Sequence, residues 1–309
     1  MNARRLVLRS LLAAGLLAAS LAETGAAQAQ IAGGRLAERL REKRAEEGRP
    51  VDLQAISPGA YKQTQAYGPD AAQQLDVYVP PGARDAPVIV MVHGGAWKIG
   101  DKANTGSVEN KLKHWLPQGY ILVSVDYRML PKAMAYEQAQ DVAKALSWVQ
   151  SHARGWGGDP DRIILMGHSA GAHLVALLSS RPEMVGRRWA GTVVLDSAAV
   201  NVSGVMARRH LGFYDEAFGQ DPAYWTKASP MEQWTPAAVP MMLVCSTRRP
   251  DAPCDDAKAF KALAARSGRA MPVLPKNLTH AEINRTLGLA GDYTRAVDAF
   301  IAARLNGGA

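Results

Sequence analysis

Residues 163–174 read Ile163-Ile164-Leu165-Met166-Gly167-His168-Ser169-Ala170-Gly171-Ala172-His173-Leu174. An apolar run of strand length meets a Gly-x-Ser-x-Gly sequence, and small and apolar residues then recur with helical spacing. This pattern indicates a strand, a sharp turn and a helix. Gly167 and Gly171 let neighbouring backbone pass close to the turn, while Ser169 is held in a strained conformation at the helix N-terminus. Free N–H groups there favour developing negative charge, which predicts that Ser169 is a nucleophile.

Strand-like and helix-like segments alternate through most of the chain. Continuous apolar runs, typical of strands covered on both faces, occupy 88–92, 121–125, 163–166, 192–195 and 241–244. Helical patterns occupy 110–116, 137–149, 257–265 and 293–305. The alternation predicts an α/β fold with a mostly parallel central sheet, helices on both faces and a site at the carboxyl ends of the strands. Residues 74–79 alternate in polarity, which predicts an exposed antiparallel strand.

The first 29 residues have the pattern of a signal peptide. Arg4, Arg5 and Arg9 form a basic region, an apolar run at 11–21 is short for a bilayer span, and Ala27-Gln28-Ala29 fits a cleavage site. We therefore expect a periplasmic or secreted protein without stable membrane insertion after cleavage. The ordinary secretory route is favoured over the twin-arginine route, which Arg4-Arg5 would also allow. An uncleaved membrane anchor is the alternative.

The rest of the chain divides into a short segment and one large domain. Residues 30–60 are charged and predict a helical or flexible segment, whereas 61–309 have the length of one catalytic α/β domain. The formal charge of +8 becomes +6 without residues 1–29. Basic residues are scattered rather than gathered in a stripe with aromatics, which argues against a nucleic-acid partner. The sequence also lacks paired metal-ligand patterns, so we expect no metal and no cofactor. The oligomeric state is left open.

A glycine pair follows the strand predicted at 88–92. His93-Gly94-Gly95-Ala96-Trp97 places backbone without side chains where a strand meets a loop. The N–H groups of Gly95 and Ala96, together with that of Ala170, form a predicted oxyanion hole. A plain tight turn is the alternative for the glycines, and His93 is expected to orient the loop by hydrogen bonding.

Two later loops carry a candidate acid and a candidate base. Asp251 lies in the loop after 241–244, and His280 lies in a loop after a last apolar segment around 271–274. The order Ser169, Asp251, His280 is the one expected for a hydrolase nucleophile, acid and base. Asp255 and Asp256 are interpreted as charges at a helix N-terminus. Asp196 follows the strand at 192–195 and could face the site, but a structural role is favoured for it.

Cys245 and Cys254 bracket Asp251. A disulfide between them would close a loop of about ten residues and restrain the acid loop. A small buried residue at a strand end is the alternative for Cys245.

Residues 199–236 are long, lack a clear period and predict a small cap over the pocket. The candidate pocket residues are aromatic or imidazole side chains from the cap, the oxyanion loop and the turn: Trp97, His168, His210, Phe213 and Trp225.

Taken together, these motifs resemble the α/β-hydrolases of the esterase/lipase group, near the exported acyl esterases and the arylformamidases. The matching motifs are His93-Gly94-Gly95-Ala96-Trp97, Asp126-Tyr127-Arg128, Gly167-His168-Ser169-Ala170-Gly171 and the loops of Asp251 and His280. Two positions depart from the family pattern. Ala96 stands where the hormone-sensitive-lipase branch has a third glycine, which favours the formamidase-like or feruloyl/acetyl-esterase-like side. Cys254 stands where relatives often have proline.

The resemblance implies an exported serine hydrolase that forms an acyl-enzyme on Ser169 and cleaves carboxylic esters with a small or aromatic acyl group. Its substrate would be a small molecule or an ester linked to a polymer. An arylformamidase-type amide hydrolase would use the same residues. A non-catalytic binding module is the alternative from a different class.

Overall fold

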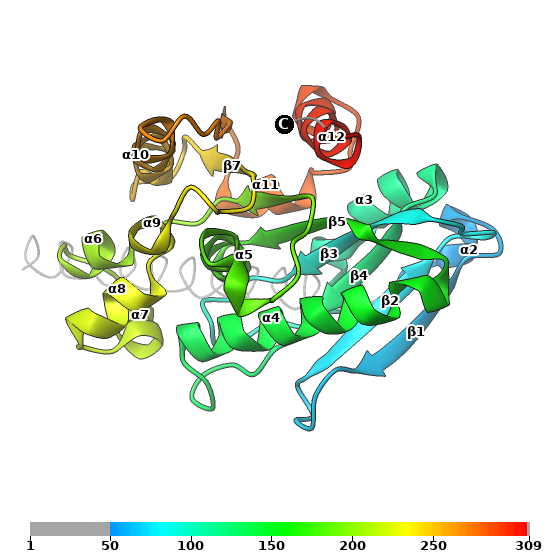
Figure 1. Cartoon of the computed structure of the whole chain (residues 1–309), viewed down its shortest axis with the longest axis horizontal. Coiled ribbons are helices and arrows are strands. Elements are labelled where there is room, and N and C mark those ends of the chain that lie inside the picture. Colours follow the sequence, from blue (N-terminus) through cyan, green and yellow to red (C-terminus); the bar gives the residue numbers. More distant parts are fainter. Residues whose placement is uncertain (1–49, 308–309) are drawn as a thin grey trace, which may run out of the picture. The chain divides into compact units, whose positions relative to one another are not determined.

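A computed structural model describes residues 50–307. The predicted signal peptide, and the predicted charged segment as far as residue 49, lie outside the described residues. The described part contains one eight-stranded sheet, and Figure 1 shows helices on both sides of it. Its strands are β1 (Tyr61–Ala66), β2 (Gln74–Val79), β3 (Ala86–Val92), β4 (Ile121–Val125), β5 (Gly158–His168), β6 (Gly191–Leu195), β7 (Met241–Ser246) and β8 (Val273–Lys276).

The longer helices lie between these strands or after them. Three of the four predicted helical patterns fall within helices, and the pattern at 110–116 ends one residue after its helix. Each helix begins one to five residues before the predicted start. The α-helices are α2 (Leu53–Ile56), α3 (Thr105–Trp115), α4 (Ala135–His152), α5 (Ala170–Ser180), α6 (Val202–Met206), α7 (Gly212–Phe218), α8 (Pro222–Ala228), α9 (Pro230–Gln233), α10 (Pro253–Ala265), α11 (His280–Arg285) and α12 (Asp292–Leu305). None of the helices described is long and apolar enough to cross a bilayer.

The strand order is β1-β2-β4-β3-β5-β6-β7-β8, with β1 and β2 antiparallel to their neighbours and the rest parallel. The parallel strands therefore end at one edge of the sheet, where β5 lies between β3 and β6. Residues that directly follow β3, β5, β6 and β7 are brought close together at this edge. The predicted mostly parallel α/β sheet is confirmed.

Two apolar layers cover the two faces of the sheet, as the side-chain alternation of strands requires. On β3, Val88, Val90 and Val92 face a core shared with α4, α5 and α10, whereas Ile89 and Met91 face a core shared with α3 and α12. All five side chains are fully buried. These cores fix β3 and β5, and through them the turns at their ends.

The prediction of an exposed strand at 74–79 is right about direction and wrong about exposure. β2 is antiparallel, but it pairs with β1 on one side and β4 on the other, so five of its six residues are buried. The exposed edge strand is β1, whose sequence is mostly polar and whose side chains are exposed or half-buried.

Between β6 and β7, the segment predicted to form a cap contains four short helices, α6 to α9. Figure 1 shows α6, α7 and α8 grouped together next to α9. Hydrogen bonds from Tyr224 of α8 fasten this segment to α4: its hydroxyl accepts from the backbone N–H of Tyr136 and donates to the carboxylate of Glu137.

The close approach of β3 to α5 predicts a large effect of one added methyl group. A Cβ atom at Gly171 would lie 2.3 Å from the carbonyl oxygen of Val92 and 2.4 Å from that of His93. Backbone cannot yield as a side chain can, so Gly171→Ala should lower the free energy of unfolding by about 1 to 3 kcal/mol in urea denaturation. Gly155→Ala is the matched control, because its Cβ would meet nothing within 4 Å. Equal stability of the two variants would contradict the described packing.

Candidate active site

Ser169 occupies the turn between β5 and α5 in a strained conformation, with φ of 58° and ψ of −118°. The turn is tight because a Cβ at Gly167 would lie 2.4 Å from the carbonyl oxygen of Gly171. The predicted strand, sharp turn and helix are confirmed. Ser169 is half-buried, so its hydroxyl stands at the edge of the sheet rather than in the core.

His280 is the first residue of α11, and a capping box fixes the start of this helix. The Thr279 side chain accepts from the backbone N–H of Glu282, and the Glu282 carboxylate accepts from the backbone N–H of Thr279. The ring reaches Ser169: Nε2 of His280 lies 2.9 Å from its Oγ. With the ring proton on Nδ1, Nε2 can accept the serine hydroxyl proton.

The structure corrects the predicted acid. Nδ1 of His280 lies 2.6 Å from Oδ2 of Asp196, not beside Asp251. The Asp251 carboxylate instead accepts from Nε and Nη2 of Arg249 and is exposed. Asp255 pairs with Lys258 and Asp256 with Arg208, as expected of charges in the first turn of α10. Of these four carboxylates, only Asp196 contacts the ring of His280.

The geometry of the sheet explains this difference. Asp196 directly follows β6, the strand next to β5, so it lies one strand away from Ser169 at the same edge. Asp251 is five residues beyond the end of β7, and its side chain turns to Arg249. The sequence contains a signal for Asp196, a carboxylate immediately after a buried strand. The chain order Ser, Asp, His fits both carboxylates, so it could not decide between them.

Asp196 is held ionised in a buried position. Its side chain is fully buried, whereas that of His280 is 37% exposed. Burial by itself would raise the pKa of Asp196, but the hydrogen bond from His280, the Arg249 charge and the backbone N–H of Ser246 together lower it. A carboxylate in this state can fix the tautomer of His280 and stabilise its charged form.

The predicted oxyanion loop runs beside Ser169. A Cβ at Gly94 would lie 2.7 Å from the Cβ of Ser169. Gly95 has a φ of 125°, and its Cβ would collide with the backbone of Ile99, so the loop needs glycine there. Within residues 50–307, no protein acceptor takes the backbone N–H of Gly95, Ala96 or Ala170. Those N–H groups are therefore available at this end of the sheet.

His93 orients this loop, as expected. Its Nδ1 lies 2.7 Å from the carbonyl oxygen of Gly94, and its ring stacks on Tyr127 at 4.6 Å between centroids. The Tyr127 hydroxyl donates to the carbonyl oxygen of His93. The Asp126-Tyr127-Arg128 motif thus supports the loop from β4.

Trp97 is a structural anchor of the loop rather than an open pocket wall. The side chain is buried, and its Nε1–H donates to Nδ1 of His173, 3.3 Å away. The indole packs on Tyr214 and Phe218 of the cap. Burial lowers the pKa of His173 to about 4, so it stays neutral and donates from Nε2 to the carbonyl oxygen of Ala228. One imidazole therefore joins α5, the oxyanion loop and the cap.

His168, another predicted pocket residue, contacts the backbone and the ring of His280. Its Nε2 lies 2.9 Å from the carbonyl oxygen of His280, and the two rings pack at 4.5 Å between centroids. Burial and the neighbouring His280 lower the pKa of His168 to about 3, so the ring is a neutral donor. The contact positions the backbone of His280.

The other candidate pocket residues lie in the cap. His210 is half-buried between the carbonyl oxygen of Arg208 and the carboxylate of Asp215. The rings of Phe213 and Trp97 pack with 6.2 Å between their centroids. Trp225 donates from Nε1 to the carbonyl oxygen of Gly219. All three are only partly buried, so each leaves some surface for a ligand.

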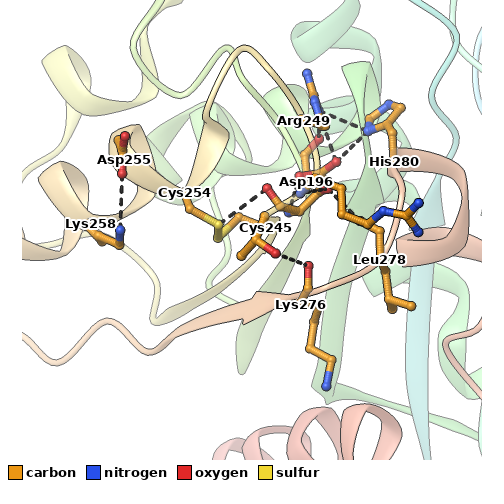
Figure 2. Close-up of a disulfide and its surroundings, with 12 residues drawn as sticks. Asp196, Cys245, Arg249, Cys254, Asp255, Lys258, Lys276, Leu278 and His280 are labelled. Carbon is orange, nitrogen blue, oxygen red and sulfur yellow. Dashed lines mark hydrogen bonds and ion pairs between the residues drawn. A yellow bond between two sulfur atoms is a disulfide. The ribbon is translucent and has the colours of Figure 1, made fainter.

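A disulfide joins Cys245 at the end of β7 to Cys254 in the first turn of α10. It closes the loop that carries Arg249 and Asp251, and Figure 2 shows this loop next to Asp196 and His280. A loop of this length contributes about 2 to 3 kcal/mol of stability by restricting the unfolded chain. The alternative of a free buried Cys245 is wrong.

Backbone strain gathers around these side chains. Six non-glycine residues among those described have positive φ, and four belong to the site: Ala96, Trp97, Ser169 and Asp196. Strain of this kind persists where packing over-determines the backbone, and it clusters at functional sites.

Comparisons with known proteins point to one group. The family model BD-FAE matches residues 75–186, from β2 past the serine turn. The isoprenylcysteine alpha-carbonyl methylesterase of Arabidopsis thaliana is 31% identical over 221 residues, which cover 64% of this chain and 51% of that protein. Esterase LipQ of Mycobacterium tuberculosis is 29% identical over 202 residues, which cover 60% of this chain and 48% of that protein. The chain thus spans about half the length of these curated relatives.

Solved structures share the fold. Thermogutta terrifontis esterase 2, phosphonylated by sarin, has a TM-score of 0.67 at 21% identity, covering 81% of this chain and 96% of that one. Esterase B from Lactobacillus rhamnosis has a TM-score of 0.67 at 20% identity, and the match covers 91% of this chain and 95% of that one. With a serine turn, a glycine loop and an imidazole at the same sheet edge, the chain has the α/β-hydrolase fold and is similar to proteins of the esterase/lipase group.

Proposed function

We propose that the protein is a serine hydrolase that cleaves carboxylic esters through an acyl-enzyme on Ser169. The observation that carries the proposal is the continuous path from Ser169 Oγ to His280 Nε2, 2.9 Å, and from His280 Nδ1 to Asp196, 2.6 Å. A hydroxyl, a neutral imidazole and a buried carboxylate in this order can activate the serine for attack on a carbonyl carbon.

In the acylation step, Ser169 Oγ attacks the ester carbonyl carbon while its proton passes to His280 Nε2. The N–H groups of Gly95, Ala96 and Ala170 would hold the negative oxygen of the tetrahedral intermediate, and one such donor is typically worth roughly 100- to 1,000-fold in rate. The imidazolium, stabilised by Asp196, then protonates the leaving alcohol as the carbon–oxygen bond breaks. Water repeats the sequence: it loses a proton to His280, attacks the acyl carbon and releases the acid with Ser169 restored.

For the substrate, we propose an ester with a small or aromatic acyl group, free or linked to a polymer. Phe213 and Trp225 of the cap are only partly buried, which supports an apolar acyl or alcohol moiety. The curated relatives include a methylesterase and an esterase, which supports ester over amide chemistry. A non-catalytic binding role is disfavoured because it gives no reason for the aligned serine, imidazole and carboxylate.

We also propose export to the periplasm or beyond. The basic and apolar pattern of residues 1–29 supports it, and so does the disulfide, because disulfides persist in oxidising compartments.

Replacing the nucleophile gives the first test. Ser169→Ala should lose nearly all hydrolysis of phenyl acetate while keeping the wild-type unfolding midpoint, because only the hydroxyl is removed. A fluorophosphonate probe should label the wild type at Ser169, identified by peptide mass spectrometry, and leave the variant unlabelled. If the variant keeps half of the wild-type turnover, the proposal is wrong.

The two candidate acids give the second test. Asp196→Asn should lower turnover by roughly 10,000-fold, because the amide allows the wrong tautomer of His280 and removes the charge. Asp251→Asn should lower it by less than about tenfold, because Asp251 contacts Arg249 and not the ring. Asp255→Asn, on the exposed first turn of α10, is the control. If Asp251→Asn silences a folded enzyme and Asp196→Asn does not, the acid is assigned to the wrong residue.

Substrate preference distinguishes an ester hydrolase from an arylformamidase-type amide hydrolase. We expect kcat/KM for phenyl acetate and a feruloyl ester to exceed that for an N-formyl aryl amide by more than about tenfold, since esters have the better leaving group. A preference for the formamide would make ester hydrolysis a side activity.

A further inference from the structure

The guanidinium of Arg249 lies against both members of the acid–base pair. Its Nη1 is 3.1 Å from the Oδ2 and the carbonyl oxygen of Asp196, and 3.0 Å from Nδ1 of His280. Figure 2 shows the three side chains converging at this point. The opposite edge of the guanidinium donates from Nε and Nη2 to Asp251.

Several elements hold Arg249 in this place. The side chain is only 17% exposed, and its loop is closed by the disulfide between Cys245 and Cys254. It also interacts with the hydroxyl of Tyr214 in cap helix α7. Burial acts against its charge, but the two carboxylates outweigh this and raise the pKa of Arg249, so the group is a permanent cation. The position is therefore a built contact rather than a mobile surface side chain.

A fixed cation at this distance must act on the charge of the imidazole. When the ring carries its proton on Nδ1, that N–H and the Arg249 Nη1–H both point at Asp196, and the carboxylate accepts from both. Arg249 thereby stabilises the Asp196 anion, but it opposes a second positive charge on His280. Asp251 contacts the far side of the guanidinium and offsets part of its charge.

We propose that Arg249 is a positioning residue that orients Asp196 toward His280 and keeps the imidazole neutral at lower pH, and that Asp251 moderates its charge. The inference rests on the proposed function, because it takes His280 as the general base. It gives Asp251, the acid favoured by the sequence, an indirect role.

Other charged and titratable groups near the ring are already compensated or neutral. His168 from β5 is neutral. Burial lowers the pKa of Lys111 of α3 to about 7, and its Nζ donates to the carbonyl and side-chain oxygens of Asn284 at 2.8 Å rather than to Asp196. On the helix of His280 itself, Glu282 faces Arg248 at 3.6 Å. The hydroxyl of Tyr293, near Asp196, is occupied by the carbonyl oxygen of Ile283. Arg249 is thus the cation in direct contact with the acid–base pair among the described residues.

The test compares the acid limb of the pH profile in four variants, read from the rate of fluorophosphonate labelling of Ser169. Arg249→Gln should move the midpoint of the acid limb to higher pH by about one unit, because the imidazolium loses a repelling neighbour. Asp251→Asn should move it to lower pH by about half a unit, because the Arg249 charge is less offset. Arg249→Lys keeps the charge and should stay within about 0.3 unit of the wild type. Lys258→Gln removes an exposed cation that pairs with Asp255 on α10, away from Asp196 and His280, and should leave the limb unchanged.

A second readout needs no reaction. The ¹⁵N chemical shifts of the His280 ring, followed against pH in wild type and variants, report the same midpoints in folded protein whether or not Ser169 is labelled. Failure of the proposed function and failure of this inference are therefore distinguishable. Opposite shifts for Arg249→Gln and Asp251→Asn would support the role of Arg249. Shifts in the same direction, or no shift in Arg249→Gln, would overturn it.

Discussion

The buried carboxylate of Asp196 is the group on which the whole site depends. A fully buried anion is costly unless every oxygen is paired, and here His280, Arg249 and the backbone N–H of Ser246 supply the donors. These donors come from α11, from the loop after β7 and from β7 itself. Satisfying one carboxylate therefore fixes two separate segments relative to β6, β7 with its following loop and α11, and α11 carries the imidazole that faces Ser169.

The oxyanion loop is organised by a second set of buried polar contacts. His173 accepts from Trp97 and donates to Ala228, so a single neutral ring sets the distance between α5, the loop and the cap. The carbonyl oxygen of Trp97 accepts from Gln138 of α4 and from the backbone N–H of Leu130. These contacts hold Ala96 and Trp97 in left-handed conformations that neither residue favours on its own.

The sequence predicted the framework well because strand runs and glycine patterns are local signals. The apolar runs ending at Val92 and Met166 lie in β3 and β5, and Ser169 lies at the strained turn that its flanking glycines indicated. His280 was found because it alone among the histidines followed the last strand. Asp196 was underrated because its role depends on β6 lying next to β5, a long-range pairing that no local pattern shows. The burial of β2 was missed for the same reason, because it depends on the pairing of β2 with β1. Trp97 and His168 were assigned to the pocket from their chemistry, whereas their partners, His173 and the carbonyl oxygen of His280, became visible only in three dimensions.

In the site described above, the imidazole of His280 donates from Nδ1 to Asp196. The most direct measurement is the proton NMR resonance of that Nδ1–H, which a short hydrogen bond to a carboxylate shifts far downfield. We expect this resonance in the wild type and in Asp251→Asn, and we expect Asp196→Asn to remove it or move it upfield. A resonance that survives in Asp196→Asn and disappears in Asp251→Asn would show that Asp251, and not Asp196, accepts the hydrogen bond from His280.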